Sequence, residues 1–403
     1  MTATNRGCRV DSRGWPPASE TTIVQFAYAI LGAAVILVVL WDAFETIVLP
    51  RRVTRRFRLT RAFYRSTWRV WSLVVCRVAP GKRRETFLAL YGPLSLIFLL
   101  IVWAVGLILG FALLHYGIGS AVSLAGETPS FRVDLYLSGT TFFTLGMGDV
   151  TPRNTTARVF TVLESGMGFG FLALVISYLP VLYQSFSRRE LPIAMLDARA
   201  GSPPTAAELL RRHASADGLE ALQRFLRDLE RWAAELLESH ISYPVLGYFR
   251  SQHANQSWLS ALTVLLDSSA LVIAGSDGAC ARQAQLTFAM ARHVVVDLAQ
   301  VFSTPPVTPP TDRLAPADLA AIRKELAAAG LRLHEGLAVD VRLNELRGLY
   351  EPYVYSLAKR LRVNIPPWIA YKKTPDNWQT SAWGRMSGFD IGAAKETFPD
   401  DHL

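Results

Sequence analysis

Residues 140–152 read TTFFTLGMGDVTP, and almost none of their side chains can carry out acid–base or nucleophilic chemistry. Their main chain is the more promising source of chemistry, because Gly146 and Gly148 permit positive φ. When such residues alternate with others, successive carbonyl oxygens can turn toward one axis. A row of carbonyl oxygens is an ion ligand, so this stretch predicts cation coordination by the backbone.

Long apolar segments flank this stretch. A bilayer is crossed by ~20 apolar residues, and three segments qualify: residues 22–49, 87–115 and 159–186. A cleaved signal peptide is the alternative for the first segment, but no Ala-x-Ala-like site follows it and arginines come at once. In the second segment, Gly92-Pro93 is a bend that a membrane helix tolerates.

The loops between these segments predict their orientation. Residues 50–86 hold twelve arginines and lysines against the single acid Glu85, which favours the cytoplasmic side. The N-terminal segment 1–21 and the loop 116–158 then lie outside, and residues 187–403 lie in the cytoplasm. We predict a multi-pass protein of the cell membrane.

The net charge of +9 raises the alternative of nucleic-acid binding. The positive charge is concentrated in residues 51–84, between two spans, so topology and attraction to anionic lipids of the inner leaflet explain it better. No nucleic-acid partner is predicted. Residues 70–78 are mostly apolar but too short to cross, which favours an interfacial helix lying along the inner leaflet.

No feature of the sequence indicates an enzyme or a bound cofactor. Cys8, Cys76 and Cys280 are predicted outside, at the inner surface and in the cytoplasm, so no disulfide is expected. The histidines lack the spacing of zinc ligands. We find no phosphate loop, dinucleotide-binding fingerprint or nucleophile motif. No catalytic residue is predicted, and no cofactor other than permeant ions.

The middle of the loop 116–158 is too apolar for an ordinary external loop. Residues 134–143 have the length of a short helix, begin with an acid and cannot span the bilayer. Non-helical backbone at membrane depth requires cover by protein or a water-filled path beside it, and residues 144–149 are such backbone. We therefore predict a pore loop at 134–149, in which a short helix enters the membrane and the chain returns.

The stretch TTFFTLGMGDVTP resembles the selectivity filter of the potassium channels, Thr-x-Gly-Tyr/Phe-Gly-Asp preceded by a pore helix, and the resemblance covers residues 87–186. It implies a homotetramer in which four loops replace the hydration shell of K⁺ with rings of carbonyl oxygens. The Thr144 hydroxyl and carbonyl would form the innermost ion site. The resemblance places the outer sites at the carbonyls of Leu145, Gly146 and Met147, and the mouth at Gly148 and Asp149.

Met147 departs from the family, which usually has Tyr or Phe at this position. A thioether cannot hydrogen-bond or wedge as an aromatic ring does, so we expect a softer support around the filter. Strict potassium selectivity and weak selectivity among monovalent cations both stay open. Leu145, where Val or Ile is frequent, is a milder change.

The third span resembles the pore-lining inner helix of the family. Gly168 falls where many such channels have a hinge, although a small residue also permits close helix packing, and both alternatives stay open. Pro180 is expected to bend the helix near its cytoplasmic end. A gate there would be formed by apolar side chains, with three candidates: Ile176, Leu179 and Val181.

Glu164 is the single ionisable residue of the third span, and a charge there is costly unless it is paired or hydrated. We hypothesise that Glu164 lies behind the filter and holds the pore-helix backbone or the region of Asp149 by a hydrogen bond. The alternative is a structural partner without a role in gating. At the inner end of the first span, Asp42 and Glu45 are expected to pair with basic residues of the interface, namely Arg51 or Arg52.

Residues 187–403 are predicted to form a helical regulatory or assembly domain. Gly201 marks a boundary, and Thr205-Ala-Ala-Glu208 is a capping box that opens a helix. Helical periodicity recurs in several stretches: 218–239, 257–274, 279–302, 316–329 and 341–361. The Pro-rich residues 304–310 break the set, and the chain after Asn364 is expected to be loop or tail.

The sequence therefore predicts an all-α membrane protein with three transmembrane helices, a re-entrant pore helix and filter, and a cytoplasmic helical domain. The predicted function is passive conduction of potassium through a tetrameric filter. Two alternatives stay open, a weakly selective monovalent cation channel and a non-conducting signalling or scaffold protein anchored in the membrane. No span has arginine at every third position, so no voltage sensor is expected.

Overall fold

The computed structural model describes residues 18–49, 58–79, 81–124, 128–215, 218–251 and 256–370. The chain divides into two compact units. The first unit comprises Met1–Val48, Phe57–Arg61 and Ile97–Tyr178. The second unit comprises Leu49–Arg56, Ala62–Leu96 and Leu179–Leu403.

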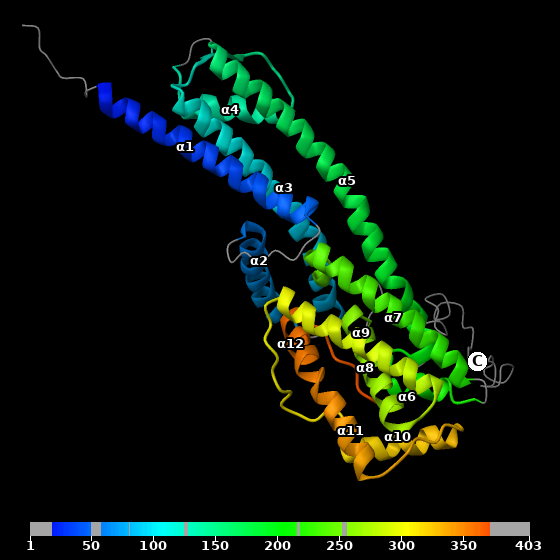
Figure 1. The fold of residues 1–403 in the computed structure, drawn as a ribbon. Coiled ribbons are helices and arrows are strands. Elements are labelled where there is room, and N and C mark those ends of the chain that lie inside the picture. Colours follow the sequence, from blue (N-terminus) through cyan, green and yellow to red (C-terminus); the bar gives the residue numbers. More distant parts are fainter. Residues whose placement is uncertain are drawn as a thin grey trace, which may run out of the picture. The chain divides into compact units, whose positions relative to one another are not determined.

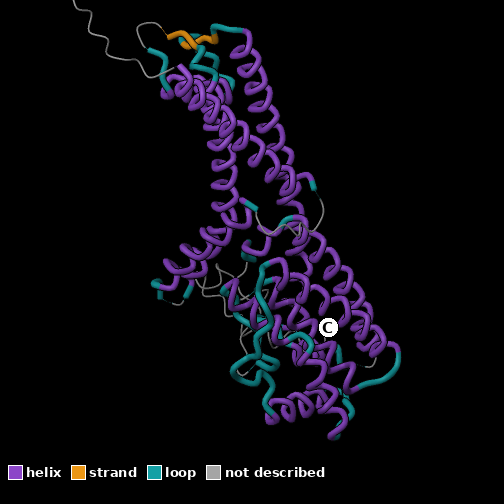
Figure 2. Tube along the Cα trace, turned by 60° about the vertical axis from the view of Figure 1, so that its left-hand side comes forward, coloured by secondary structure: helices purple, strands orange, loops and turns teal. Residues whose placement is uncertain are grey.

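The first unit is built from long apolar helices around one short helix (Figure 1). Its elements are α1 (Ala18–Ala43) with the π-helical turn η1 (Phe44–Val48), the later part of α3 (Lys82–Gly117), α4 (Phe131–Phe142) and the first part of α5 (Thr155–Ala200). Two short strands, β1 (Val122–Leu124) and β2 (Val150–Pro152), pair antiparallel on either side of α4 in the sequence (Figure 2). This all-α architecture with membrane-spanning helices confirms the predicted fold class.

The predicted spans lie within α1 and η1, α3, and α5. The helices α3 and α5 run beyond the predicted spans, and α5 continues as one helix through Pro180 and Pro192. Many of their large apolar side chains are exposed, as expected for a surface that lipid or a neighbouring subunit covers. The chain is a multi-pass membrane protein.

Glycines allow α1 to pack closely against α3. A Cβ added at Gly32 would lie 2.5 Å from the carbonyl oxygen of Gly110, and one added at Gly117 would lie 2.4 Å from the backbone nitrogen of Ala29. Both distances are too short for a real Cβ contact, so the two backbones touch only because side chains are missing. The first span, in α1, thus packs closely against α3, the helix that precedes the predicted pore loop.

Buried acids hold the end of α1 near η1. Asp42 accepts hydrogen bonds from Trp103 Nε1 at 3.0 Å on α3 and from the backbone nitrogen of Thr60 at 3.1 Å. Glu45 forms an ion pair with Arg58 at 3.5 Å. The pairing that was expected with Arg51 or Arg52 lies outside the described residues.

The second unit is a helical bundle. It contains α2 (Leu59–Cys76) from Ala62 onward, the early part of α3, the later part of α5, and a further set of elements: α6 (Ala206–Arg212), α7 (Gly218–Ser242), the 3₁₀ helix η2 (Pro244–Tyr248), α8 (Trp258–Gly275), α9 (Ala279–Val301), α10 (Pro316–Ala328), α11 (Leu337–Gly348) and α12 (Glu351–Leu361). The interfacial helix predicted at 70–78 is the later part of α2, which starts well before it.

The helix α8 lies in the core of this bundle. Among the described residues, four helices are long and apolar enough to cross a membrane, and α8 is one of them. However, 94% of its apolar window is buried inside the protein, mainly against α9 and α11. A helix that is apolar all round needs cover on every side, and neighbouring helices provide it here.

Two local predictions in this unit need correction. The stretch 341–361 is not one helix, because Pro352 cannot donate within a continuous helix and instead lies in the first turn of α12. The capping box is half formed, since Thr205 Oγ1 accepts from the backbone nitrogen of Glu208 at 3.3 Å. The Glu208 carboxylate turns to Arg211 and Arg212 instead, at 2.8 and 2.7 Å.

Candidate ion-conducting site

The candidate filter, residues 144–149, directly follows the last turn of α4 and is hydrogen-bonded to it. The backbone nitrogens of Phe143, Thr144 and Leu145 donate to carbonyl oxygens of that turn, at 3.2, 3.0 and 2.8 Å. The carbonyl oxygens of residues 144–148 accept no hydrogen bond from any described residue. The backbone donors of residues 143–145 are therefore satisfied within the chain, while the carbonyl oxygens of residues 144–148 are available to another partner.

The backbone of the filter alternates in handedness. The angle φ is +56° at Thr144, +56° at Gly146 and +78° at Gly148, and Leu145 and Met147 between them have ordinary negative values. Positive φ is unusual for a β-branched residue such as threonine, and strain of this kind gathers at functional sites. Alternation of this type turns successive carbonyl groups to the same side, as expected for cation coordination.

Space does not explain the two glycines of the filter. A Cβ added at Gly146 or Gly148 would meet no atom within 4 Å, so the requirement is for the positive φ itself. The side chains of Leu145 and Met147 are 65% and 68% exposed, which means that their own chain leaves them uncovered.

Tyr136 on α4 supports the outer end of the filter. Its Oη lies 2.9 Å from Oδ2 of Asp149 and 3.4 Å from Sδ of Met147. A thioether sulfur is a weak acceptor, so Met147 does have a hydrogen-bond partner, contrary to what the sequence indicated. The second carboxylate oxygen of Asp149 accepts from the backbone nitrogen of Val150 at 3.0 Å. Asp149 is thus fixed between the pore helix and β2.

Glu164 is fully buried and joins three helices. Its carboxyl group is hydrogen-bonded to the hydroxyl of Ser138 on α4, and its Oε2 lies 3.7 Å from Nε2 of His115 at the end of α3. The Ser138 hydroxyl also reaches the carbonyl oxygen of Ile108 at 2.7 Å. The predicted contact with the pore helix exists, but it is made to a side chain, and Asp149 has a different partner.

A second buried acid lies one turn before Ser138 on the same face of α4. Asp134 is fully buried and accepts a hydrogen bond from Ser120 Oγ at 2.5 Å. Sequence reasoning found Glu164 but missed its partners Ser138 and His115. The available signal was the presence of polar residues inside otherwise apolar helices, since such residues need partners when buried.

Gly168 on α5 contacts the end of the pore helix. An added Cβ would lie 1.9 Å from the carbonyl oxygen of Phe142, the last residue of α4. By contrast, a Cβ added at Gly166 or Gly170 would meet no atom within 4 Å. Of the two alternatives for Gly168, this contact supports close packing beneath the filter.

The gate candidates lie on a surface that their own chain leaves uncovered. Ile176 is 63% exposed, and Leu179, Pro180 and Val181 are also exposed. Tyr178, between them, is buried. Their position is compatible with a pore-lining face, and their role as a gate stays a prediction.

The comparisons with known proteins agree with this location. Residues 96–184 match a protein-family model, Ion_trans_2, whose description is ion channel. The chain is similar to the uncharacterized membrane protein YdjJ of Bacillus subtilis (strain 168), with 24% identity over 197 residues, which are 48% of this chain and 57% of YdjJ. The chain therefore spans little more than half the length of that relative. No solved structure matches the chain significantly.

Proposed function

We propose that the protein is a potassium-selective channel that conducts passively through a filter shared by four chains, since residues 96–184 match an ion channel family model. The alternating backbone at Thr144, Gly146 and Gly148 carries this proposal. It follows a pore helix directly and leaves its carbonyl oxygens without partners among the described residues. Such oxygens can replace the water around a dehydrated cation.

A single chain cannot enclose an ion with this one loop. A closed ring of carbonyl groups around an axis requires several copies, and cyclic fourfold symmetry gives the geometry of a potassium filter. The uncovered apolar residues of the first unit support assembly, because they need lipid or other subunits as cover. They include Leu145, Met147, Phe169, Leu172 and Ile176.

The ion sites follow from the order of the carbonyl groups. Thr144 would supply the innermost site with its hydroxyl and carbonyl oxygens, and Leu145, Gly146 and Met147 would supply the outer ones. Asp149 would set the negative charge at the mouth, with Tyr136 holding its carboxylate. The N-terminus would lie outside and the second unit's helices after α5 in the cytoplasm, as the basic segment 50–86 favours.

A weakly selective cation channel is the second candidate, and Met147 is the observation that favours it. Tyr136 divides its single hydroxyl proton between Met147 and Asp149, which gives weaker support than two separate donors would. A filter whose backbone is held less firmly discriminates less strictly between K⁺ and Na⁺.

Reversal potentials separate the two candidates. Purified full-length protein in planar bilayers would be recorded with K⁺ on one side and Na⁺ on the other. A reversal potential near the potassium equilibrium potential supports the first candidate, and one near zero supports the second. Met147→Tyr is the informative variant, because it restores an aromatic ring and should raise the preference for K⁺ if the side chain limits selectivity.

A further inference from the structure

We propose that α2 binds the anionic surface of the inner leaflet and that this contact controls conduction through the aromatic residues that join α2 to the bundle. The occupant of the exposed face of α2 is therefore a lipid surface. This inference rests on the proposed function and on the orientation that places residues 50–86 inside. It assigns a regulatory partner to the channel and names the contacts that transmit the signal.

The position of α2 in the chain keeps it beside the membrane. The preceding span ends with η1 at Val48, and α3, the next span, begins at Lys82. Only residues 77–81 separate α2 from α3. Fully extended, these five residues reach about 17 Å, so the end of α2 cannot move far from the start of that span.

The exposed face of α2 has the composition of an interfacial helix. Val70, Leu73 and Val74 are 63%, 58% and 53% exposed, and three exposed arginines accompany them: Arg65, Arg69 and Arg77. In the described part of the chain, none of these arginine side chains has a hydrogen-bond or ion-pair partner. Apolar side chains that enter the boundary of the acyl chains, beside arginines that reach phosphate groups, fit an anionic leaflet.

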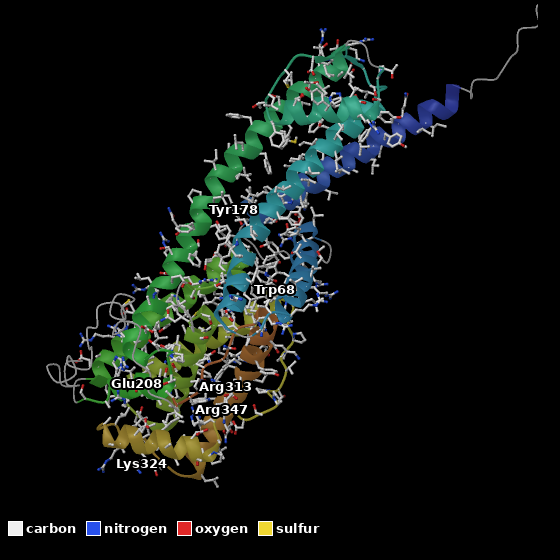
Figure 3. The ribbon with its side chains drawn as sticks, turned by 180° about the vertical axis from the view of Figure 1, so that it is seen from behind. Trp68, Tyr178, Glu208, Arg313, Lys324 and Arg347 are labelled. Carbon is white, nitrogen blue, oxygen red and sulfur yellow. The ribbon has the colours of Figure 1, made fainter. Side chains whose placement is uncertain are left out.

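The opposite face of α2 is fixed to the bundle by Trp68, which is labelled in Figure 3 and belongs to the buried core of the second unit. Trp68 is 3% exposed, and its Nε1 donates to the carbonyl oxygen of Arg360 at the end of α12 at 2.9 Å. Its ring centroid lies 4.7 Å from that of Tyr91 on α3 and 5.0 Å from that of Tyr248 in η2. A displacement of α2 must therefore move these residues or break their packing.

Phe249, directly after Tyr248, carries the contact to the inner helix. A Cβ added at Gly92 on α3 would lie 2.7 Å from the Phe249 ring, so the ring lies against the backbone of α3. On its other side, the ring centroid is 5.7 Å from that of Phe186 on α5. The Phe249 ring thus fills the space between α3 and α5.

Arg189 on α5 stabilises the contact between α5 and the segment of η2 and Phe249. Its side chain is 2% exposed and donates to the carbonyl oxygens of Leu246 at 2.7 Å and Phe249 at 3.1 Å. The backbone carbonyl of Arg189 accepts from Trp232 Nε1 at 3.1 Å. Both the backbone and the side chain of Arg189 therefore bind the bundle. A shift of η2 must move α5 as well, because Arg189 lies on α5.

The test uses the full-length protein in phosphatidylcholine vesicles with and without phosphatidylglycerol. An environment-sensitive fluorophore on Cys76, which is exposed on α2, reports the lipid contact, and Cys8→Ser with Cys280→Ser leaves one labelling site. Potassium flux is measured on the same samples. The double variant R65Q/R69Q removes two lipid-facing charges, and R224Q/R227Q, on the exposed face of α7, is the matched control.

We expect phosphatidylglycerol to shift the label signal to that of a less polar environment and to change the flux. Each arginine near the surface contributes about fivefold in affinity, so R65Q/R69Q should require roughly 25-fold more anionic lipid, while the control behaves as wild type. Phe249→Ala, or Phe249→Leu if the first variant misfolds, should keep the label response and lose the lipid dependence of flux.

Two results overturn the inference: a label that does not respond to phosphatidylglycerol, or a flux whose lipid dependence is the same in R65Q/R69Q and wild type. A normal label response without flux in any vesicle would instead overturn the proposed channel function and leave the lipid contact supported. High salt should weaken the response, because it screens charges at the membrane surface.

Discussion

Replacing Gly168 by alanine is the substitution with the sharpest expected effect on the filter. The added Cβ would lie 1.9 Å from the carbonyl oxygen of Phe142. A carbon and a carbonyl oxygen approach comfortably to about 3.3 Å, so α5 and the end of α4 would have to separate by about 1.4 Å. Because the donors of residues 143–145 bond to the last turn of α4, the filter must move with it.

The cost of Gly168→Ala follows from this overlap. Overpacking by a methyl group in a well-packed site costs about 1–3 kcal/mol, and a clash with backbone allows little relief by rotation of a side chain. Gly166→Ala and Gly170→Ala are the matched controls, since their Cβ atoms would meet no atom within 4 Å. Both controls should be stable or gain up to about 1 kcal/mol, because alanine favours the helix.

The assay combines thermal unfolding of the purified protein with reversal potentials in mixed K⁺ and Na⁺. Gly168→Ala should lower both the unfolding temperature and the preference for K⁺, and the controls should change neither adversely. A Gly168→Ala channel with wild-type stability and selectivity would refute the packing argument. If its open probability alone changed, Gly168 would act as a hinge.

Three further substitutions test the supports around the filter and the bundle. Tyr136→Phe removes the hydroxyl that holds Asp149 and should lower the K⁺/Na⁺ permeability ratio severalfold; an unchanged ratio would exclude that role. Glu164→Gln disturbs the buried contact with Ser138, worth about 1–3 kcal/mol, and unchanged conductance, inactivation and pH response would contradict a filter-supporting role. Burial, together with a nearby arginine, lowers the pKa of His240 from 6.5 to about 3. The unfolded state therefore binds the proton first, and stability falls as the pH drops below about 6.5, by about 2 kcal/mol at pH 5. His240→Phe should flatten this dependence in hydrogen-exchange measurements on the bundle, and an equal slope in the variant would contradict it.

The short helix and the irregular backbone after it were predictable because their signals are local. An acid before a short apolar segment, followed by glycines at alternate positions, predicted a helix at 134–143 and irregular backbone after it, and the structure has α4 at Phe131–Phe142. The three transmembrane spans could also be predicted, because a helix that crosses a bilayer requires a long run of apolar residues. The sequence did not show that α5 runs on without a break to Ala200, because Pro180 suggested a bend.

The supporting contacts were not predictable, because they join residues far apart in the chain. The sequence analysis did not single out Tyr136, because only the return of the chain brings Asp149 to its hydroxyl. Likewise, Glu164 was recognisable as a costly buried acid, but its partners His115 and Ser138 come from two other helices. Tertiary geometry decides such pairs, and periodicity carries no information about them.

Potassium flux through the purified full-length protein in liposomes tests the central claim most directly. Wild-type protein should carry K⁺ down its gradient, with Na⁺ competing poorly. Gly146→Ala should abolish the flux, because an L side chain resists the φ of +56° that the filter requires at this position, while Gly166→Ala should conduct as wild type. Equal K⁺ flux in Gly146→Ala and wild type would contradict conduction through this filter.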